Sequence, residues 1–369
     1  MRITFVLPDA GIAGGVRVVA IYAARLQAKG HQVTVMCLPP RPLSLREHLR
    51  CFLKGKGWTP KQPSHFDGTS IDLRRLDQWR PMTAADVPDA DVVIATWWET
   101  AEWVAQFPAS KGTKVYLIQH DEALFAGQPV ERVRQTWRLP MYKIVVAQWL
   151  SDLAAQQFDE PAVPVIPNSV DGNQFFAPPR GKQTQPTVGM MYSDTWWKGS
   201  DIGLQAFALA AQQIPNLRLV VFGLTPIAAH LPLPPDTQYF YQPPQSLIKD
   251  LYAQCDAWLF TSRVEGFGLP ILEAMACRTP VIGTPVGAAP ELLKSGGGIL
   301  VEPEDPIAMA QAIERIHALS ELEWQAMSQV AYRQATSYTW EEATQKFEAA
   351  LHEAIDRVRP CVVPSVAPM

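Results

Sequence analysis

Short apolar runs rich in β-branched residues alternate along the chain with segments whose apolar residues recur at helical spacing. In the first half, the runs that predict strands lie at 3–7, 33–37, 92–95, 115–118 and 144–147. A second series lies at 187–191, 217–222, 239–241, 257–261, 281–284 and 298–301. Strands that alternate with helices form parallel sheets covered by helices on both faces. The pattern therefore predicts the α/β class, with two Rossmann-like doubly wound domains.

A segment rich in proline and polar residues, 161–186, separates the two series. We therefore expect an N-terminal domain over 1–167 and a second domain over 168–340, followed by a helix over 341–358. Residues 359–369 show no periodicity and predict a flexible tail. Because ligands bind beyond the carboxyl ends of parallel strands, two such domains that face each other would form the active site in a cleft between them.

Composition narrows the function classes without identifying one. The 369 residues carry a formal charge of −4, which gives no overall field to attract nucleic acid. The five cysteines form an odd set without a Cys-x-x-Cys pair, so neither a disulfide framework nor a zinc ribbon is indicated. We see no signal peptide and no apolar run long enough to span a membrane. A cytoplasmic protein is expected.

The most informative stretch is Glu265-Gly-Phe-Gly-Leu-Pro-Ile-Leu-Glu273, which follows a predicted buried strand. Gly266 and Gly268 would let the backbone approach a ligand closely, and Pro270 suits the first turn of a helix. Free N–H groups at that helix start would bind a phosphate, and Glu273 could accept hydrogen bonds from ribose hydroxyls. A simpler alternative is that both glutamates only favour a helix start.

Two loops of the first domain hold further candidates. Gly14 and Gly15 open a predicted helix and would let a donor phosphate or an acceptor contact backbone N–H groups, although any tight strand-to-helix turn favours glycine. The spacing does not match a dinucleotide fingerprint. His120 follows the strand predicted at 115–118, where it could bind a sugar hydroxyl or transfer a proton, or be purely structural.

The Glu265–Glu273 string resembles the E-x7-E signature of retaining, nucleotide-sugar-dependent glycosyltransferases of family 4, which have the GT-B fold of two Rossmann-like domains. Lys198, before Gly199, resembles the lysine that holds the donor diphosphate in that family, and a glycine pair occupies the loop of Gly14 and Gly15. The family helix that corresponds to 341–358 crosses back to the N-terminal domain. The resemblance is strong over about 165–320 and fainter before it.

The resemblance implies transfer of a sugar from a nucleotide-diphosphate donor to a hydroxyl of a glycan or lipid-linked acceptor, with no cofactor. It assigns Glu265 to the transferred sugar and Lys198 to the diphosphate. We see no acidic cluster that would carry a metal ion, so no metal site is assigned. The remaining donor-binding candidates are Gly266, Phe267, Gly268, Leu269 and Glu273.

One position departs from the family pattern. Tyr192 stands where the family usually has an arginine, about six residues before the lysine. Arg263 could replace that cation, or the hydroxyls of Tyr192 and Ser193 could bind the phosphate directly. The departure leaves open the alternative of a non-catalytic sugar-nucleotide-binding subunit. A sugar-nucleotide epimerase of similar fold is a further alternative.

A basic segment over 41–61 has six Lys or Arg residues against Glu47 alone, with apolar residues near helical spacing. Such a segment could lie on anionic lipid at the inner membrane face, grip an acidic acceptor, or be a solvated surface helix.

Overall fold

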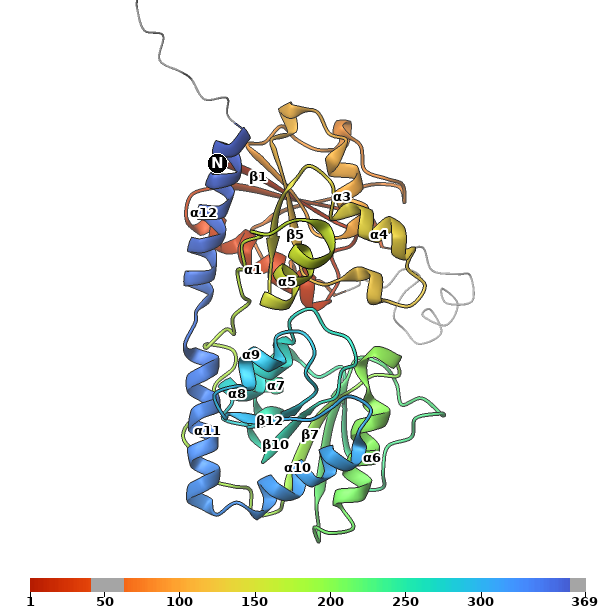
Figure 1. Ribbon diagram of the computed structural model, residues 1–369, viewed down its shortest axis with the longest axis vertical. Helices are drawn as coiled ribbons and strands as arrows, with labels where there is room; N and C mark the ends of the chain where they lie inside the picture. The colour runs from red at the N-terminus through yellow and green to blue at the C-terminus, as the bar shows by residue number, and fades with distance from the viewer. Residues whose placement is uncertain (41–62, 359–369) are drawn as a thin grey trace, which may run out of the picture. The chain divides into compact units, whose positions relative to one another are not determined.

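The structure, a computed structural model, describes residues 1–40 and 63–358 (Figure 1). The basic segment over 41–61 and the tail over 359–369 lie outside the described residues. The chain forms two compact units. The first contains Met1–Val145, Ser151–Ile166 and the chain from Thr344 onward, and the second contains Val146–Leu150 and Pro167–Ala343.

The first unit is built on a parallel sheet of six strands in the order β3-β2-β1-β4-β5-β6. The strands are β1 (Arg2–Leu7), β2 (Gln32–Cys37), β3 (Asp72–Arg75), β4 (Val92–Ala95), β5 (Thr113–Ile118) and β6 (Tyr142–Val145). Because β1 is central and the order reverses beside it, the β1/β4 boundary is the topological switch point of this sheet.

The helices of this unit connect successive strands. They are α1 (Gly14–Ala28), η1 (Ala84–Asp86), α3 (Trp98–Ala105), η2 (Ala109–Lys111), η3 (Glu122–Leu124) and α4 (Val130–Thr136). A further helix, α5 (Gln148–Phe158), follows β6 and belongs to this unit from Ser151 onward. As the sequence predicts, α1 begins at the glycine pair and is followed by Gly30 with a positive φ of 88°.

The C-terminal helix α12 (Trp340–Val358) belongs to the first unit from Thr344 onward. The Phe347 ring stacks on Tyr22 with a centroid distance of 4.3 Å. Beside it, the Glu348 carboxylate lies 2.7 Å from Nε2 of His31 and 3.0 Å from Nζ of Lys29. An aromatic contact and two ionic contacts therefore fix this helix against α1 and the turn that follows it.

The second unit repeats the architecture with a parallel sheet in the order β12-β11-β10-β7-β8-β9. Its strands are β7 (Thr187–Tyr192), β8 (Arg218–Gly223), β9 (Gln238–Tyr241), β10 (Ala257–Phe260), β11 (Val281–Gly283) and β12 (Gly298–Leu300). The switch point here lies between β7 and β10.

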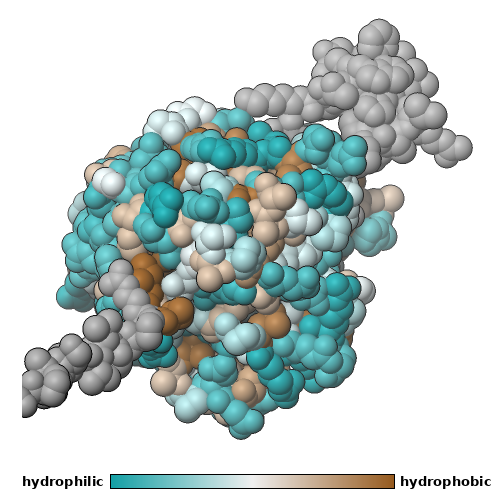
Figure 2. Space-filling model, turned by 90° about the horizontal axis from the view of Figure 1, so that it is seen from above, coloured by the Kyte–Doolittle hydropathy of each residue, from teal (hydrophilic) through white to brown (hydrophobic). Residues whose placement is uncertain are grey.

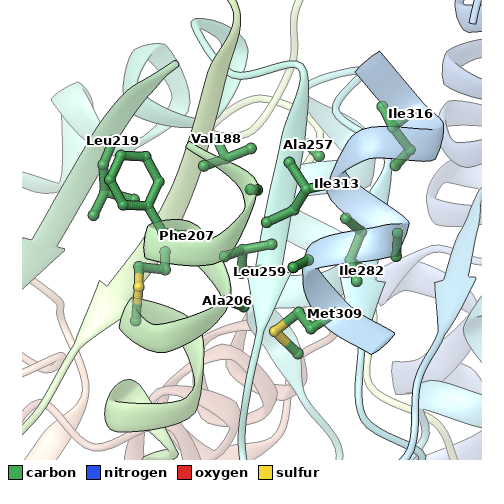
Figure 3. Close-up of a cluster of buried hydrophobic side chains, with 14 of the residues drawn as sticks. Val188, Ala206, Phe207, Leu219, Ala257, Leu259, Ile282, Met309, Ile313 and Ile316 are labelled. Carbon is green, nitrogen blue, oxygen red and sulfur yellow. The ribbon is translucent and has the colours of Figure 1, made fainter. Parts of the chain in front are cut away.

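Helices on this sheet complete the core of the second unit. They are η4 (Trp196–Lys198), α6 (Ser200–Ala210), α7 (Gln245–Ala253), α8 (Leu269–Ala276), α9 (Ala289–Leu293), α10 (Pro306–Ala318) and α11 (Glu321–Thr336). Figure 3 shows Phe207 of α6 and Ile313 of α10 packed over the strands that carry Leu219, Leu259 and Ile282. Burial of this apolar layer, at about 25 cal/mol per Å², holds the sheet and its helices together.

The prediction of two Rossmann-like α/β units is confirmed. The strand β3 was missed, because Asp72-Leu-Arg-Arg is a mostly exposed edge strand without an apolar run. Pairing with β2 in parallel register, and not hydrophobicity, defines this strand.

Within the described residues, no helix combines the length and apolar character needed to cross a membrane. The face drawn in Figure 2 is largely hydrophilic, with small separate apolar patches.

Candidate active site

Lys198 and Glu265 meet at the switch point of the second sheet. Lys198 lies in the loop after β7, and Glu265 lies in the loop after the neighbouring strand β10. The Lys198 Nζ is 2.5 Å from Oε1 of Glu265, which also accepts a hydrogen bond of 3.0 Å from the Ser262 hydroxyl. The lysine side chain is 33% exposed and the glutamate side chain 15% exposed. The pair is therefore accessible to a ligand yet held in place.

Close contact between the two loops positions this pair. The Thr261 hydroxyl donates to the Lys198 carbonyl at 2.8 Å, and the Arg263 N–H donates to the Trp197 carbonyl at 2.8 Å. Gly199 has a φ of 61°, and a Cβ there would lie 1.9 Å from the Thr261 carbonyl oxygen. Only glycine allows the loop after β7 to approach so closely, which explains the Lys-Gly order of the motif.

The glycine loop leads into α8 as the sequence predicts. Gly268 is the N-cap residue with a φ of 96°, and the proline at 270 falls in the first turn. Hydrogen bonds to its carbonyl oxygens hold the loop: the Ala288 backbone N–H donates to the Phe267 carbonyl at 2.9 Å, and the Trp149 indole N–H donates to the Gly266 carbonyl at 2.8 Å. Leu269 begins the helix, and its N–H is the one left for an anion among the first three helical residues, because Pro270 has no N–H and the Ile271 N–H donates to the Gly268 carbonyl at 3.0 Å.

Glu273 lies inside α8 and is 8% exposed. Its Oε2 accepts a hydrogen bond of 2.9 Å from the Tyr252 hydroxyl. A neutral donor thus fixes the orientation of the carboxylate. Sequence reasoning missed Tyr252, which comes from α7 and carries no motif of its own.

The Arg263 guanidinium is not an unpaired cation. Its guanidinium forms two hydrogen bonds of 2.8 Å to the Asp201 carboxylate and also pairs with Glu304. These contacts raise the pKa of Arg263 and leave its side chain 8% exposed. Two carboxylates already offset the charge of Arg263. In this arrangement Arg263 links the loop after β10 to Asp201 of α6.

The two hydroxyls considered beside it are also engaged. Tyr192 is 1% exposed, and its hydroxyl donates to the Leu231 carbonyl at 2.8 Å and accepts from the Ala228 N–H at 2.8 Å. The Ser193 hydroxyl donates to the Thr195 hydroxyl at 2.8 Å. The Ser193 hydroxyl also accepts from the Thr195 N–H at 3.2 Å, so all three groups considered as replacements for the family arginine are engaged within the fold.

The candidates of the first unit gather at the carboxyl edge of its own sheet. The Gln119 side-chain amide donates to the Gly15 carbonyl at 3.2 Å, which ties the end of β5 to the start of α1 beside Gly14. The His120 ring stacks on Phe125 with a centroid distance of 4.3 Å, and its Nδ1 lies 2.8 Å from the carbonyl oxygen of the next residue. The imidazole is thereby oriented at the strand edge.

The two acidic residues after His120 are buried and structural. Glu122 is 2% exposed and accepts a hydrogen bond of 2.7 Å from the Trp98 N–H and one of 3.3 Å from the Tyr116 hydroxyl. Burial raises the pKa of Glu122 well above its ordinary value. Asp121 caps η3 by accepting from the Ala123 N–H.

Acidic side chains do not gather into a metal site in the part of the chain that the structure describes. Among residues 1–40 and 63–358, no three His, Cys, Asp or Glu side chains form a metal-binding group. The sequence does contain one Asp-x-Asp, Asp89-Ala-Asp91, which sequence reasoning missed. It lies before β4 at the amino edge of the sheet, where Lys111 and Arg2 pair with its two carboxylates.

His65 is a further residue that the sequence did not single out. Its backbone N–H donates to the Gly11 carbonyl at 3.3 Å in the loop between β1 and α1, and burial lowers the pKa of its ring. It reaches this loop from a distant part of the chain, so no local motif could reveal it.

Comparison with known proteins agrees with this arrangement. Residues 173–333 match the model of the family described as glycosyl transferases group 1. A D-inositol 3-phosphate glycosyltransferase of Mycobacterium bovis is 31% identical over 174 residues, which cover 43% of this chain and 35% of that protein. One component of the phosphatidylinositol N-acetylglucosaminyltransferase of Arabidopsis thaliana is 28% identical over 52% of this chain and 44% of its own length. The chain thus spans less than half the length of the curated relatives it matches.

Solved structures resemble the chain over nearly its whole length. HepE of Anabaena, solved with UDP and glucose, has a TM-score of 0.74 at 17% identity and covers 96% of this chain and 100% of its own. Sucrose-phosphate synthase from Thermosynechococcus elongatus has a TM-score of 0.72 at 17% identity, with 97% and 100% coverage. The two sheets with their helices thus have the GT-B fold.

Proposed function

We propose that this chain is a retaining glycosyltransferase of family 4 that moves a sugar from a nucleotide-diphosphate donor to a hydroxyl of a glycan or lipid-linked acceptor. The observation that carries the proposal is the contact of Lys198 with Glu265 at the switch point of the second sheet, next to the N-terminus of α8. A cation, a carboxylate and the Leu269 N–H at the start of α8 lie there, and a charged sugar donor needs such groups.

The proposed chemistry follows from charge. As the glycosidic C–O bond breaks, negative charge grows on the leaving diphosphate, and Lys198 with the N–H groups of α8 would stabilise it. By analogy with an oxyanion hole, each such donor is worth roughly 3–4 kcal/mol in the transition state. We infer departure and attack on the same face of the sugar, which retains the anomeric configuration, and no divalent ion takes part in this scheme.

The other residues would position the substrates. Glu265 is assigned to the transferred sugar, and Glu273 to the ribose, with the Tyr252 hydroxyl orienting the carboxylate for that contact. His120 is assigned to the acceptor side, as a hydrogen-bonding or proton-transfer group. We place the reaction in the cytoplasm, with contact to the inner membrane face through the segment over 41–61.

The names of similar proteins support the donor class. HepE was solved with UDP-glucose, and the relatives in Mycobacterium and Arabidopsis are named for transfer to inositol-containing acceptors. A first donor panel should therefore contain UDP-glucose and UDP-N-acetylglucosamine, followed by GDP- and ADP-linked sugars.

Incubation of the full chain with radiolabelled donors tests the proposal. Slow release of free sugar and nucleoside diphosphate, faster when an acceptor is added, is the expected result. Saturable binding without any turnover would instead identify a sugar-nucleotide-binding subunit. Conversion of the donor to an isomeric nucleotide sugar without an acceptor would identify an epimerase.

A further inference from the structure

A cavity lies in the second unit, at the opposite end of α8 from Gly268. Its volume is about 600 Å³, and it is bounded by the segment before β7, the C-terminal end of α8 and the helix α11. The polar side chains that line it are Arg180, Arg278, Gln325, Ser328 and Gln329. Eight helical residues separate this cavity from the candidate active site, a distance of about 12 Å along the axis of α8.

Arg278 is a buried cation with neutral partners. Arg278 is 8% exposed. Its guanidinium donates to the Ala177 carbonyl at 3.0 Å and to Oε1 of Gln329 at 2.7 Å. The guanidinium also lies 4.0 Å from the centroid of the Tyr332 ring. Contact with an aromatic face holds the guanidinium plane fixed without neutralising its charge.

Arg180 is held in the same manner. It donates to the carbonyl oxygens of Gly181 and Cys255 and to the Thr279 hydroxyl, and it lies 4.6 Å from the centroid of the Trp324 ring. Its Nε is buried and makes no hydrogen bond to any residue that the structure describes. Because burial closes this N–H to water and to the cavity alike, a ligand in the cavity would contact Arg180 through its terminal nitrogens, and Nε–H would sense the change in their charge environment.

No carboxylate in the described residues forms an ion pair with either guanidinium. The acidic group that acts on Arg180 is Asp256, whose two oxygens accept from the backbone N–H groups of Gln183 and Thr187. Burial lowers the pKa of Arg180, and the nearby charge of Arg278 lowers it further. A half-buried Arg180 and a buried Arg278 therefore bring two positive charges to one cavity, where Asp256 acts on Arg180 from a distance and neither guanidinium is in an ion pair with any described residue.

The backbone at Arg278 adds an independent observation. Arg278 has a φ of 61°, directly after the end of α8. Glycine or asparagine normally occupies such a left-handed position, since other residues are strained there. The Arg278 N–H donates to the Met275 carbonyl and the Thr279 N–H to the Ala274 carbonyl, both at 3.0 Å, so this residue ends α8 and thereby fixes where its cationic side chain begins.

We propose that this cavity binds a small phosphorylated molecule, with Arg180 and Arg278 as the two groups that grip its phosphate. The planar fork of a guanidinium matches the oxygens of a phosphate, and paired arginines give both charge and orientation. The volume also suits more than a bare ion, because small-molecule sites usually measure about 300–1,000 Å³. The site does not depend on the proposed transfer reaction, and its ligand would regulate or stabilise the second unit.

Inorganic phosphate is the probe for a direct test. The 15N-labelled full chain carrying Lys198→Ala, which removes the main cation of the active site, is titrated at constant ionic strength. The Nε–H resonance of Arg180, assigned by its loss in Arg180→Lys, is followed. We expect a saturable shift of this resonance, and a dissociation constant at least about 10-fold weaker in Arg278→Lys, which keeps the charge but loses the fork.

A second variant distinguishes loss of phosphate binding from loss of the fold. Gln329→Glu keeps the shape of the side chain and places a carboxylate against Arg278, so it should fold normally and abolish the shift. The matched control Gln212→Glu, an exposed change on the same unit, should bind as the parent does. A shift that does not saturate, or that persists unchanged in a folded Gln329→Glu chain, would overturn the proposal, whether or not the protein proves to be a transferase.

Discussion

The ammonium of Lys198 and the carboxylate of Glu265 are joined by a 2.5 Å salt bridge, although 67 positions separate the two residues in the chain. The family resemblance assigns Lys198 to the diphosphate of the donor and Glu265 to its sugar. A bound diphosphate must therefore compete with Glu265 for the charge of Lys198. Loss of the Lys198 charge and loss of the Glu265 charge should therefore change the affinity for a diphosphate in opposite directions.

Glu265→Gln should separate binding from turnover. Removal of the carboxylate frees Lys198 and removes a negative charge near the diphosphate, so free nucleoside diphosphate should bind about as tightly or a few-fold more tightly than to the wild type. The sugar loses its hydrogen-bonding partner, and turnover should fall at least about 10-fold. Calorimetry with the free diphosphate and a donor-turnover assay measure the two effects. Weaker diphosphate binding would contradict the competition between the two partners.

Glu273→Gln should weaken the nucleotide in both ground and transition states. A hydrogen bond to a charged group is worth about 1.5–3 kcal/mol, so affinity for the free nucleoside diphosphate should fall roughly 10- to 100-fold, with the change appearing mainly in KM. Tyr252→Phe, which removes the hydroxyl that orients this carboxylate, should give a smaller loss in the same direction. Affinity that stays the same in both variants is incompatible with a ribose contact.

Glu122→Gln should stabilise the protein increasingly as pH rises. The pKa of Glu122 is raised by burial, so the stability that its protonated form contributes is present below the ordinary carboxyl pKa and is lost as pH rises through the folded value. Between the ordinary and the folded pKa, this loss is at most about 1.4 kcal/mol for each pH unit, or roughly 3–5 °C in Tm for a domain of this size. Thermal unfolding of the variant and the wild type between pH 5 and 8 measures this. Glu131→Gln, an exposed control on α4, should show no such trend; a pH-independent difference for Glu122→Gln would mean that the carboxyl is ionised in the fold.

Alternating apolar runs were enough to predict both sheets, because fully buried parallel strands need continuous apolar sequence. The polar edge strand β3 lacks that signal, and only its pairing partner identifies it. The helix start after Gly268 was also predictable, because the Pro270 that follows suits a first helical turn, whereas the positive φ of Gly199 emerges only from the structure.

The sequence could not predict partners that come from distant segments. Arg263 looks like a spare cation beside Glu265, yet Asp201 and Glu304 already balance it. Tyr192 looks like a replacement ligand, but its hydroxyl is used within the fold. Such pairings depend on packing in three dimensions, which spacing along the chain does not contain.

The basic segment over 41–61 carries a prediction from sequence alone. Its six basic residues against one acidic residue should give about 1 kcal/mol of attraction per basic residue near an anionic surface, weakened by salt. Wild-type protein should float with anionic vesicles at low salt and not with neutral ones, and replacement of Arg46, Arg50, Lys54 and Lys56 by glutamine should abolish flotation. If the replacements change acceptor use but leave flotation intact, the segment grips the acceptor and does not dock on the membrane.

Release of nucleoside diphosphate from a nucleotide sugar, compared between the wild type and Lys198→Ala in buffer that contains EDTA, tests the central claim most directly. The account predicts that the wild type turns over without a divalent ion, because Lys198 and the N–H groups of α8 handle the charge. It predicts a 10²- to 10³-fold lower rate for the variant, on the scale of a lost oxyanion-hole donor, with the Tm unchanged. The exposed control Lys294→Ala should keep full activity. Full activity in Lys198→Ala, or wild-type activity that EDTA abolishes and a divalent ion restores, would contradict the account.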